Sequence, residues 1–194
     1  MERNDEQLMD AHIRGDDSAF SELIIRYAHA LFGYLLRLTG QRQDAEDLLQ
    51  ETLLRIHHKA HTFKSNARFK PWAFTIATNI ANDRFRKQKR IGYIQSLDDP
   101  DHPIPETAFE DCNNGTGCNP VATIIKSELK EQVLHAIQTL PTQQRTALVL
   151  AYYHDLPYRD VAEVMNCSVG TVKTHMSRAL HKLADILPVP GSEL

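Results

Sequence analysis

The stretch FKPWAFTIATNIANDRFRKQKR, residues 69–90, combines aromatic rings with basic side chains. It contains the only tryptophan, Trp72, and six lysines or arginines against a single acid, Asp83, although the whole chain carries a net charge of −3. Cations follow phosphates and aromatic rings stack on exposed bases, so this composition suits single-stranded nucleic acid. The same pattern also fits an amphipathic helix with an aromatic core side and a solvated basic face.

Helical periodicity precedes this stretch. Apolar residues recur at spacings of three and four over residues 7–34, with an interruption at Gly15 where Asp17 or Ser18 can cap the next helix. Gly40 is expected to end that helix.

A second amphipathic helix is predicted over residues 44–61, with acids in its first two turns, where they oppose the positive end of the helix dipole. The quoted stretch supplies a third helix. Pro71 fits the first turn of this helix, which we expect to run to about Lys89.

The composition changes sharply over residues 97–119. This segment contains six acids, no lysine or arginine, and several prolines and glycines. Such a composition predicts a flexible acidic linker between two domains. We therefore place the first domain at residues 1–92, the linker at 93–120 and the second domain at 121–194.

Helical periodicity returns after Pro120 and predicts helices over residues 121–140, 143–153, 156–165 and 169–187. The last two are joined by a short turn, Asn166–Ser168, which is the geometry of a helix-turn-helix. Ser168 can cap the final helix. The side chains that then project outward are small, polar or cationic and suit a DNA major groove: Gly170, Thr171, Lys173, Thr174, Ser177, Arg178 and His181.

The fold class is therefore all-α, with two small helical domains. The composition is that of an ordinary globular protein, with 42% hydrophobic and 24% charged residues. No apolar run approaches a membrane span, and the polar N-terminus is not a signal peptide. Three cysteines do not make a disulfide framework, so a cytoplasmic location is the default. No nucleotide-binding loop or catalytic constellation occurs, and we expect neither an enzyme nor a cofactor.

Two groups of residues, histidines and cysteines, leave metal binding and redox sensing open. His57 and His61 lie four residues apart, a spacing that can hold a metal ion, but no further ligands complete a site and none is predicted. Cys112 and Cys118 in the linker could pair or bind metal as a redox sensor. Cys167 is expected to be buried in the turn.

The order of these parts resembles bacterial RNA polymerase sigma factors, in particular the extracytoplasmic-function group of the sigma-70 family. DAEDLLQETLLRIHHKAHTF, residues 44–63, is similar to the helix of region 2 that binds core polymerase. The opening stretch resembles the helix that melts the promoter and reads its −10 element. LPTQQRTALVLAYYHDLPYRDVAEVMNCSVGTVKTHMSRALHKL, residues 140–183, is similar to region 4, which reads the −35 element.

The resemblance implies site residues. Core polymerase would contact Asp44, Glu46, Asp47, Leu48, Gln50 and Glu51. Promoter DNA at −10, with a flipped base in the loop of residues 62–68, would contact Phe63, Ser65, Asn66, Trp72, Asn79, Asp83, Arg86, Lys87, Lys89 and Arg90. Duplex DNA at −35 would contact Ser168, Gly170, Thr171, Lys173, Thr174, Ser177 and Arg178.

The resemblance also implies partners. We expect core RNA polymerase, promoter DNA and a membrane-linked anti-sigma factor that covers the polymerase-binding surfaces, with no insertion of this chain into the membrane. Trp72 can instead be structural, and the acidic linker can be a simple tether. Two other hypotheses remain at this point: a free-standing helix-turn-helix regulator and a helical scaffold without a nucleic-acid role.

Overall fold

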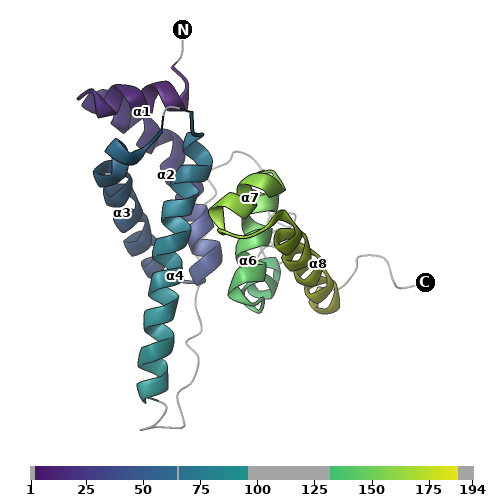
Figure 1. Cartoon of the computed structure of the whole chain (residues 1–194). Coiled ribbons are helices and arrows are strands. Elements are labelled where there is room, and N and C mark those ends of the chain that lie inside the picture. The colour runs from purple at the N-terminus through teal and green to yellow at the C-terminus, as the bar shows by residue number, and fades with distance from the viewer. Residues whose placement is uncertain (1–2, 65, 96–131, 188–194) are drawn as a thin grey trace, which may run out of the picture.

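The computed structural model describes residues 3–64, 66–95 and 132–187 (Figure 1). Within these ranges every regular element is a helix, which confirms the all-α class. Residues 93–95, at the start of the predicted linker, are helical. The rest of the linker, with Cys112 and Cys118, lies outside the described residues. No helix in the described ranges is long and apolar enough to cross a bilayer.

The N-terminal half consists of α1 (Asp5–Ile13), α2 (Asp17–Thr39), α3 (Arg42–Lys59), the short 3-10 helix η1 (Ala60–Thr62) and α4 (Phe69–Gln95). The interruption predicted at Gly15 is present, since Gly15 has a φ of 97°. The cap of α2 is Asp16, whose side chain accepts from the Ala19 amide, and not Asp17 or Ser18 as predicted. Ser18 instead donates its hydroxyl proton to Asp16.

The C-terminal half consists of a helical segment at residues 132–138, α6 (Thr142–Leu148), the π-helical turn η2 (Val149–Tyr153), α7 (Tyr158–Val164) and α8 (Val169–Ile186). The helix predicted over residues 143–153 is thus an α-helix that widens into a π-helix. The turn between α7 and α8 contains Asn166 at a φ of 49°, and Ser168 caps α8 by accepting from the Thr171 amide, as predicted.

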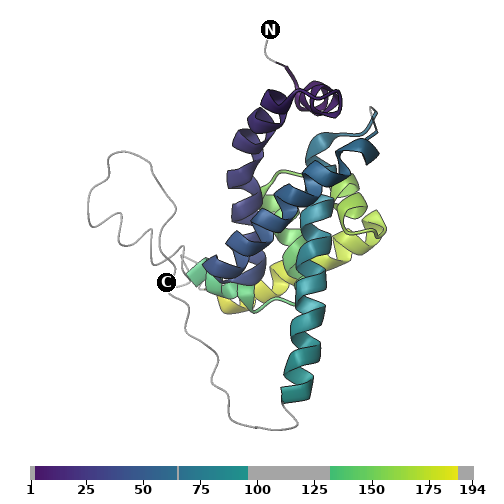
Figure 2. The same cartoon turned by 90° about the vertical axis from the view of Figure 1, so that its left-hand side faces the viewer.

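A single hydrophobic core cluster runs through both halves. Tyr34 and Phe74 are fully buried in it, with their ring centroids 5.2 Å apart. The ring of His154, from the end of η2, lies 4.8 Å from Phe74 and 5.7 Å from Tyr34. The two halves therefore pack against each other, with η2 and α6 against α2, and α7 against α4 (Figures 1 and 2).

Polar side chains of the C-terminal half donate hydrogen bonds to carbonyl groups at the end of α2. Arg145 Nη1 donates to the Leu38 carbonyl at 2.5 Å, and Gln138 Nε2 donates to the Arg37 carbonyl at 2.7 Å. The last carbonyls of a helix lack intrahelical partners, so these contacts replace water at a buried helix end. Gly40 ends α2 with a φ of 75°, and a Cβ added there would lie 3.0 Å from the Gln138 side chain.

Candidate polymerase and nucleic-acid interfaces

One face of α3 is exposed and acidic. Asp47, Gln50 and Glu51 are exposed on it, whereas Leu48 has 2% exposure and belongs to the core. Sequence periodicity places Leu48 on the apolar stripe of α3, so its burial follows from helix packing. Leu54, which is absent from the predicted contact residues, is 63% exposed beside the acids. Leu54 is an apolar residue that lies outside the apolar face of α3, and this position is the sequence signal that could have identified it.

Three acids of α3, Asp44, Glu46 and Glu51, are paired with arginines. Asp44 accepts from Arg84 of α4 at 2.7 Å and is only partly exposed, so this pair ties α3 to α4. Glu46 and Glu51 each pair at 2.8 Å with an arginine four residues away on α3. Such exposed pairs stabilise a helix by about 0.3–0.5 kcal/mol each. Asp47 accepts a long hydrogen bond from the Gln43 side-chain amide, 3.4 Å away.

Four of the six basic residues of α4 lie in its C-terminal part: Arg86, Lys87, Lys89 and Arg90. In Figures 1 and 2 the C-terminal part of α4 extends beyond the other helices. Lys87 and Arg90 are exposed there, and Arg86 is exposed and paired with Asp83, while the side chain of Lys89 lies outside the described residues. Asn79 is exposed on the same face as Asp83 and Arg86, at helical spacings of four and three.

The aromatic residues at the start of α4 form a ring cluster. Phe63 has 7% exposure, its centroid lies 5.2 Å from Trp72, and Phe69 has 2% exposure. The structure thus places Phe63 in the core, and only Trp72 keeps a partly exposed ring. Asn66 in the preceding loop is exposed, and Ser65 lies outside the described residues. The first amide of α4, on Phe69, donates to Glu6 Oε1 at 3.0 Å.

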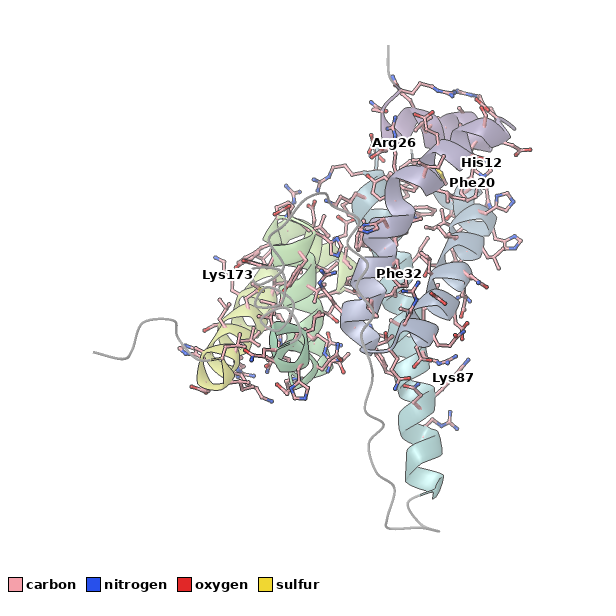
Figure 3. The ribbon with its side chains drawn as sticks, turned by 180° about the vertical axis from the view of Figure 1, so that it is seen from behind. His12, Phe20, Arg26, Phe32, Lys87 and Lys173 are labelled. Carbon is pink, nitrogen blue, oxygen red and sulfur yellow. The ribbon has the colours of Figure 1, made fainter. Side chains whose placement is uncertain are left out.

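The outward face of α8 is exposed as predicted. The exposed residues are Ser168, Gly170, Thr171, Lys173, Thr174, Ser177 and Arg178. The opposite face packs through Val172, Met176 and Ala179, which are buried. Figure 3 shows Lys173 on α8 and Lys87 on α4, on separate halves of the molecule. The molecule therefore exposes two separate cationic surfaces, one on α4 and one on α8.

His57 and His61, whose spacing of four residues could suit a metal ion, have different surroundings in the structure. His57 Nδ1 lies 3.2 Å from His12 Nε2, and His12 stacks on Phe20 with ring centroids 4.5 Å apart (Figure 3). Burial and the nearby His57 lower the pKa of His12. His61 is exposed, and in the described part of the chain no three potential ligands gather. Cys167 is partly buried, which raises the pKa of its thiol.

Comparisons with known proteins identify the two halves. The family model for sigma-70 region 2 matches residues 23–91, and the model for sigma-70 region 4 matches residues 130–183. The RNA polymerase sigma-H factor of Pseudomonas aeruginosa is 30% identical over 92% of this chain and 91% of its own length. The chain belongs to the sigma-70 family of RNA polymerase sigma factors, in its extracytoplasmic-function group.

Further relatives agree with this sigma factor assignment. The extracytoplasmic-function sigma-E factor of Haemophilus influenzae is 31% identical over 90% of both chains. The sigma factor RpoE of Bartonella quintana, solved in complex with the anti-sigma factor NepR, is 26% identical with a TM-score of 0.71, covering 88% of this chain and 98% of that one. Sigma factors are transcription initiation factors, which confirms the expectation that the protein is not an enzyme.

Proposed function

We propose that this sigma factor binds core RNA polymerase through α3, binds the melted −10 strand through α4 and its preceding loop, and binds duplex −35 DNA through α8. The observation that carries the proposal is the match of the two sigma regions to two halves, each of which presents an exposed polar helix face. We assign residues 1–92 to region 2, 93–120 to the linker and 121–194 to region 4.

The polymerase contact is centred on Asp47, Gln50, Glu51 and Leu54. An exposed leucine among acids supplies apolar area that a partner can bury, and the acids favour a basic partner surface. Asp44 and Glu46 flank this surface in ion pairs. We leave Leu48 out of the contact because its side chain is buried.

The −10 contact combines two chemistries along α4. Lys87, Lys89 and Arg90 supply phosphate contacts, which are salt-dependent and independent of sequence. Asn79 and Arg86 offer hydrogen-bond donors to unstacked bases, and the partly exposed ring of Trp72 offers a stacking surface. We also leave out Phe63, since its ring fills the core.

The −35 contact uses the first three turns of α8. Lys173 and Arg178 are exposed cations that suit guanine edges or phosphates, and Thr174 is an exposed hydroxyl that donates to the Gly170 carbonyl at 3.0 Å. Ser168 has a structural role as the cap of α8 and is exposed beside Thr171.

An anti-sigma factor is the regulatory partner that we propose. A relative, RpoE of Bartonella quintana, was solved with the anti-sigma factor NepR bound. By analogy, a membrane-linked anti-sigma factor would hold this chain inactive in the cytoplasm by covering the α3 face and region 4.

Run-off transcription with purified core polymerase tests the proposal. Adding the chain should produce promoter-dependent transcripts from genomic fragments, and core polymerase alone should not. Asp47→Lys with Glu51→Lys should abolish transcription and co-purification with the core. The matched control reverses two exposed acids of region 4, Glu163→Lys with Asp185→Lys, and should retain core binding. Equal co-purification of both double variants would remove the α3 face from the interface.

A further inference from the structure

An ion pair joins the loop before α4 to the helix-turn-helix. Arg68 Nη2 donates to Asp160 Oδ1, across the contact between α4 and α7. The side chain of Arg68 is 59% exposed, whereas that of Asp160 is 2% exposed. A cation that faces solvent therefore neutralises an almost fully buried carboxylate of the other half.

Asp160 depends on this partner. Its second oxygen, Oδ2, is buried and makes no hydrogen bond to any part of the chain that the structure describes. A buried carboxylate is stabilised only where it is paired, so Arg68 contributes to the packing of α7 on α4. Next to it, Lys70 Nζ donates to the His154 carbonyl at 2.6 Å, a second cationic contact from α4 to the C-terminal half.

Arg68 also lies where the proposed function places DNA. It follows the exposed Asn66 by two residues and immediately precedes α4. Its exposed guanidinium is suited to a phosphate, which it can bind through two parallel N–H donors. A phosphate brought to Arg68 in this arrangement also approaches the Asp160 carboxylate, and the two like charges repel each other.

We propose that Arg68 is a further contact to the melted −10 strand, and that Asp160 competes with the strand for its guanidinium. Strand binding at the loop and packing of α7 on α4 then oppose each other. Region 4 thereby weakens the −10 contact of the free chain until the two halves separate. The inference rests on the proposed −10 role of region 2.

The test is equilibrium binding of the full chain to a labelled single-stranded oligo(dT) of about 15 nucleotides, because a phosphate contact does not depend on base sequence. Asp160→Asn keeps the shape of the side chain and removes its charge. We expect it to bind the strand about tenfold more tightly than wild type, the size of one charge-assisted hydrogen bond. Glu163→Gln, an exposed acid of the same helix, removes the same charge and should change affinity less than about twofold.

A double-mutant cycle isolates the pair. Arg68→Gln alone should weaken binding and flatten its salt dependence, and in this background Asp160→Asn should give no gain. Equal effects of Asp160→Asn and Glu163→Gln would overturn the competition. A gain that persists without Arg68 would show that Asp160 acts elsewhere.

The same titrations in the presence of core polymerase distinguish a failure of the −10 function from a failure of the role assigned to Arg68. If neither the free chain nor its polymerase complex binds the strand, the −10 function itself fails. If wild type and Arg68→Gln bind equally well in both settings, only the assignment of Arg68 fails. Because Arg68→Gln removes the partner of the buried Asp160, thermal melting monitored by circular dichroism is run on every variant. If Arg68→Gln disturbs folding, the comparison of Asp160→Asn with the double variant, in which no carboxylate is left unpaired, measures the contact of Arg68 with the strand.

Discussion

His154 should make the stability of the protein fall on acidification. The residue is 8% exposed, and its ring packs on Tyr34 and Phe74, between the two halves. Burial, followed by the nearby charges of Arg37 and Lys70, lowers the pKa of His154 to about 4 from 6.5. The folded chain therefore holds a neutral imidazole at a pH where the unfolded chain binds a proton.

The magnitude follows from proton linkage. A lowered folded-state pKa contributes stability that is fully present above the unfolded value of 6.5 and is lost as the pH falls toward 4. Between pH 7 and pH 5 the loss from this one group is about 2 kcal/mol. His154→Phe keeps an aromatic ring and removes the proton site, and Nε2 of His154 is already buried without a partner among the described residues. The variant should therefore lose about 2 kcal/mol less than wild type over this interval.

Urea unfolding at pH 7 and pH 5, followed by far-ultraviolet circular dichroism, measures both differences. Repacking of a larger ring shifts the free energy of unfolding at both pH values alike, so the comparison across pH isolates the titration. His135→Gln removes an exposed histidine of the same half and should retain the wild-type dependence. Equal losses in wild type and His154→Phe would refute the argument that His154 is neutral and buried between the halves.

Two further substitutions test the proposed −35 contact of α8 and the contact between the halves. Arg178→Ala should weaken promoter binding by about 1–3 kcal/mol at a single −35 base pair if Arg178 contacts a base edge, measured by competition among single-base promoter variants; uniform weakening would make it a phosphate contact. Gly40→Ala should lower the free energy of unfolding by about 1–2 kcal/mol, because its φ of 75° disfavours a Cβ and Gln138 would lie 3.0 Å away; unchanged urea unfolding would contradict this.

Local signals in the sequence predicted most helix boundaries. Gly40 ends α2 in the left-handed conformation and Ser168 caps α8, since each depends on the backbone chemistry of one residue. The cap of α2 was predicted one or two residues too late, at Asp17 or Ser18, because Asp16, Asp17 and Ser18 all carry a side-chain oxygen that can cap a helix. The widening of α6 into η2 had no local signal in the pattern of apolar residues.

The contact between the halves could not be predicted. Asp160 and His154 resemble surface residues in the sequence, yet both are buried because α7 and η2 pack on α4 and α2. Their partners lie far away in the chain, so no local periodicity reveals them. Similarly, periodicity predicted an exposed face on α3 but not that Asp44 is held by Arg84. Local chemistry thus predicted the exposed helix faces, and long-range packing determines which of their residues are accessible.

Permanganate footprinting tests the central claim most directly. Genomic promoter fragments would be incubated with core polymerase and the chain, and thymine reactivity around −10 reports strand opening. We predict opening that requires both proteins. Asn79→Ala should lose it on duplex templates and regain it on templates with a pre-opened bubble, whereas Lys87→Ala with Arg90→Ala should weaken binding on both in a salt-dependent way. Thymines no more reactive with the chain than with core polymerase alone would contradict the account.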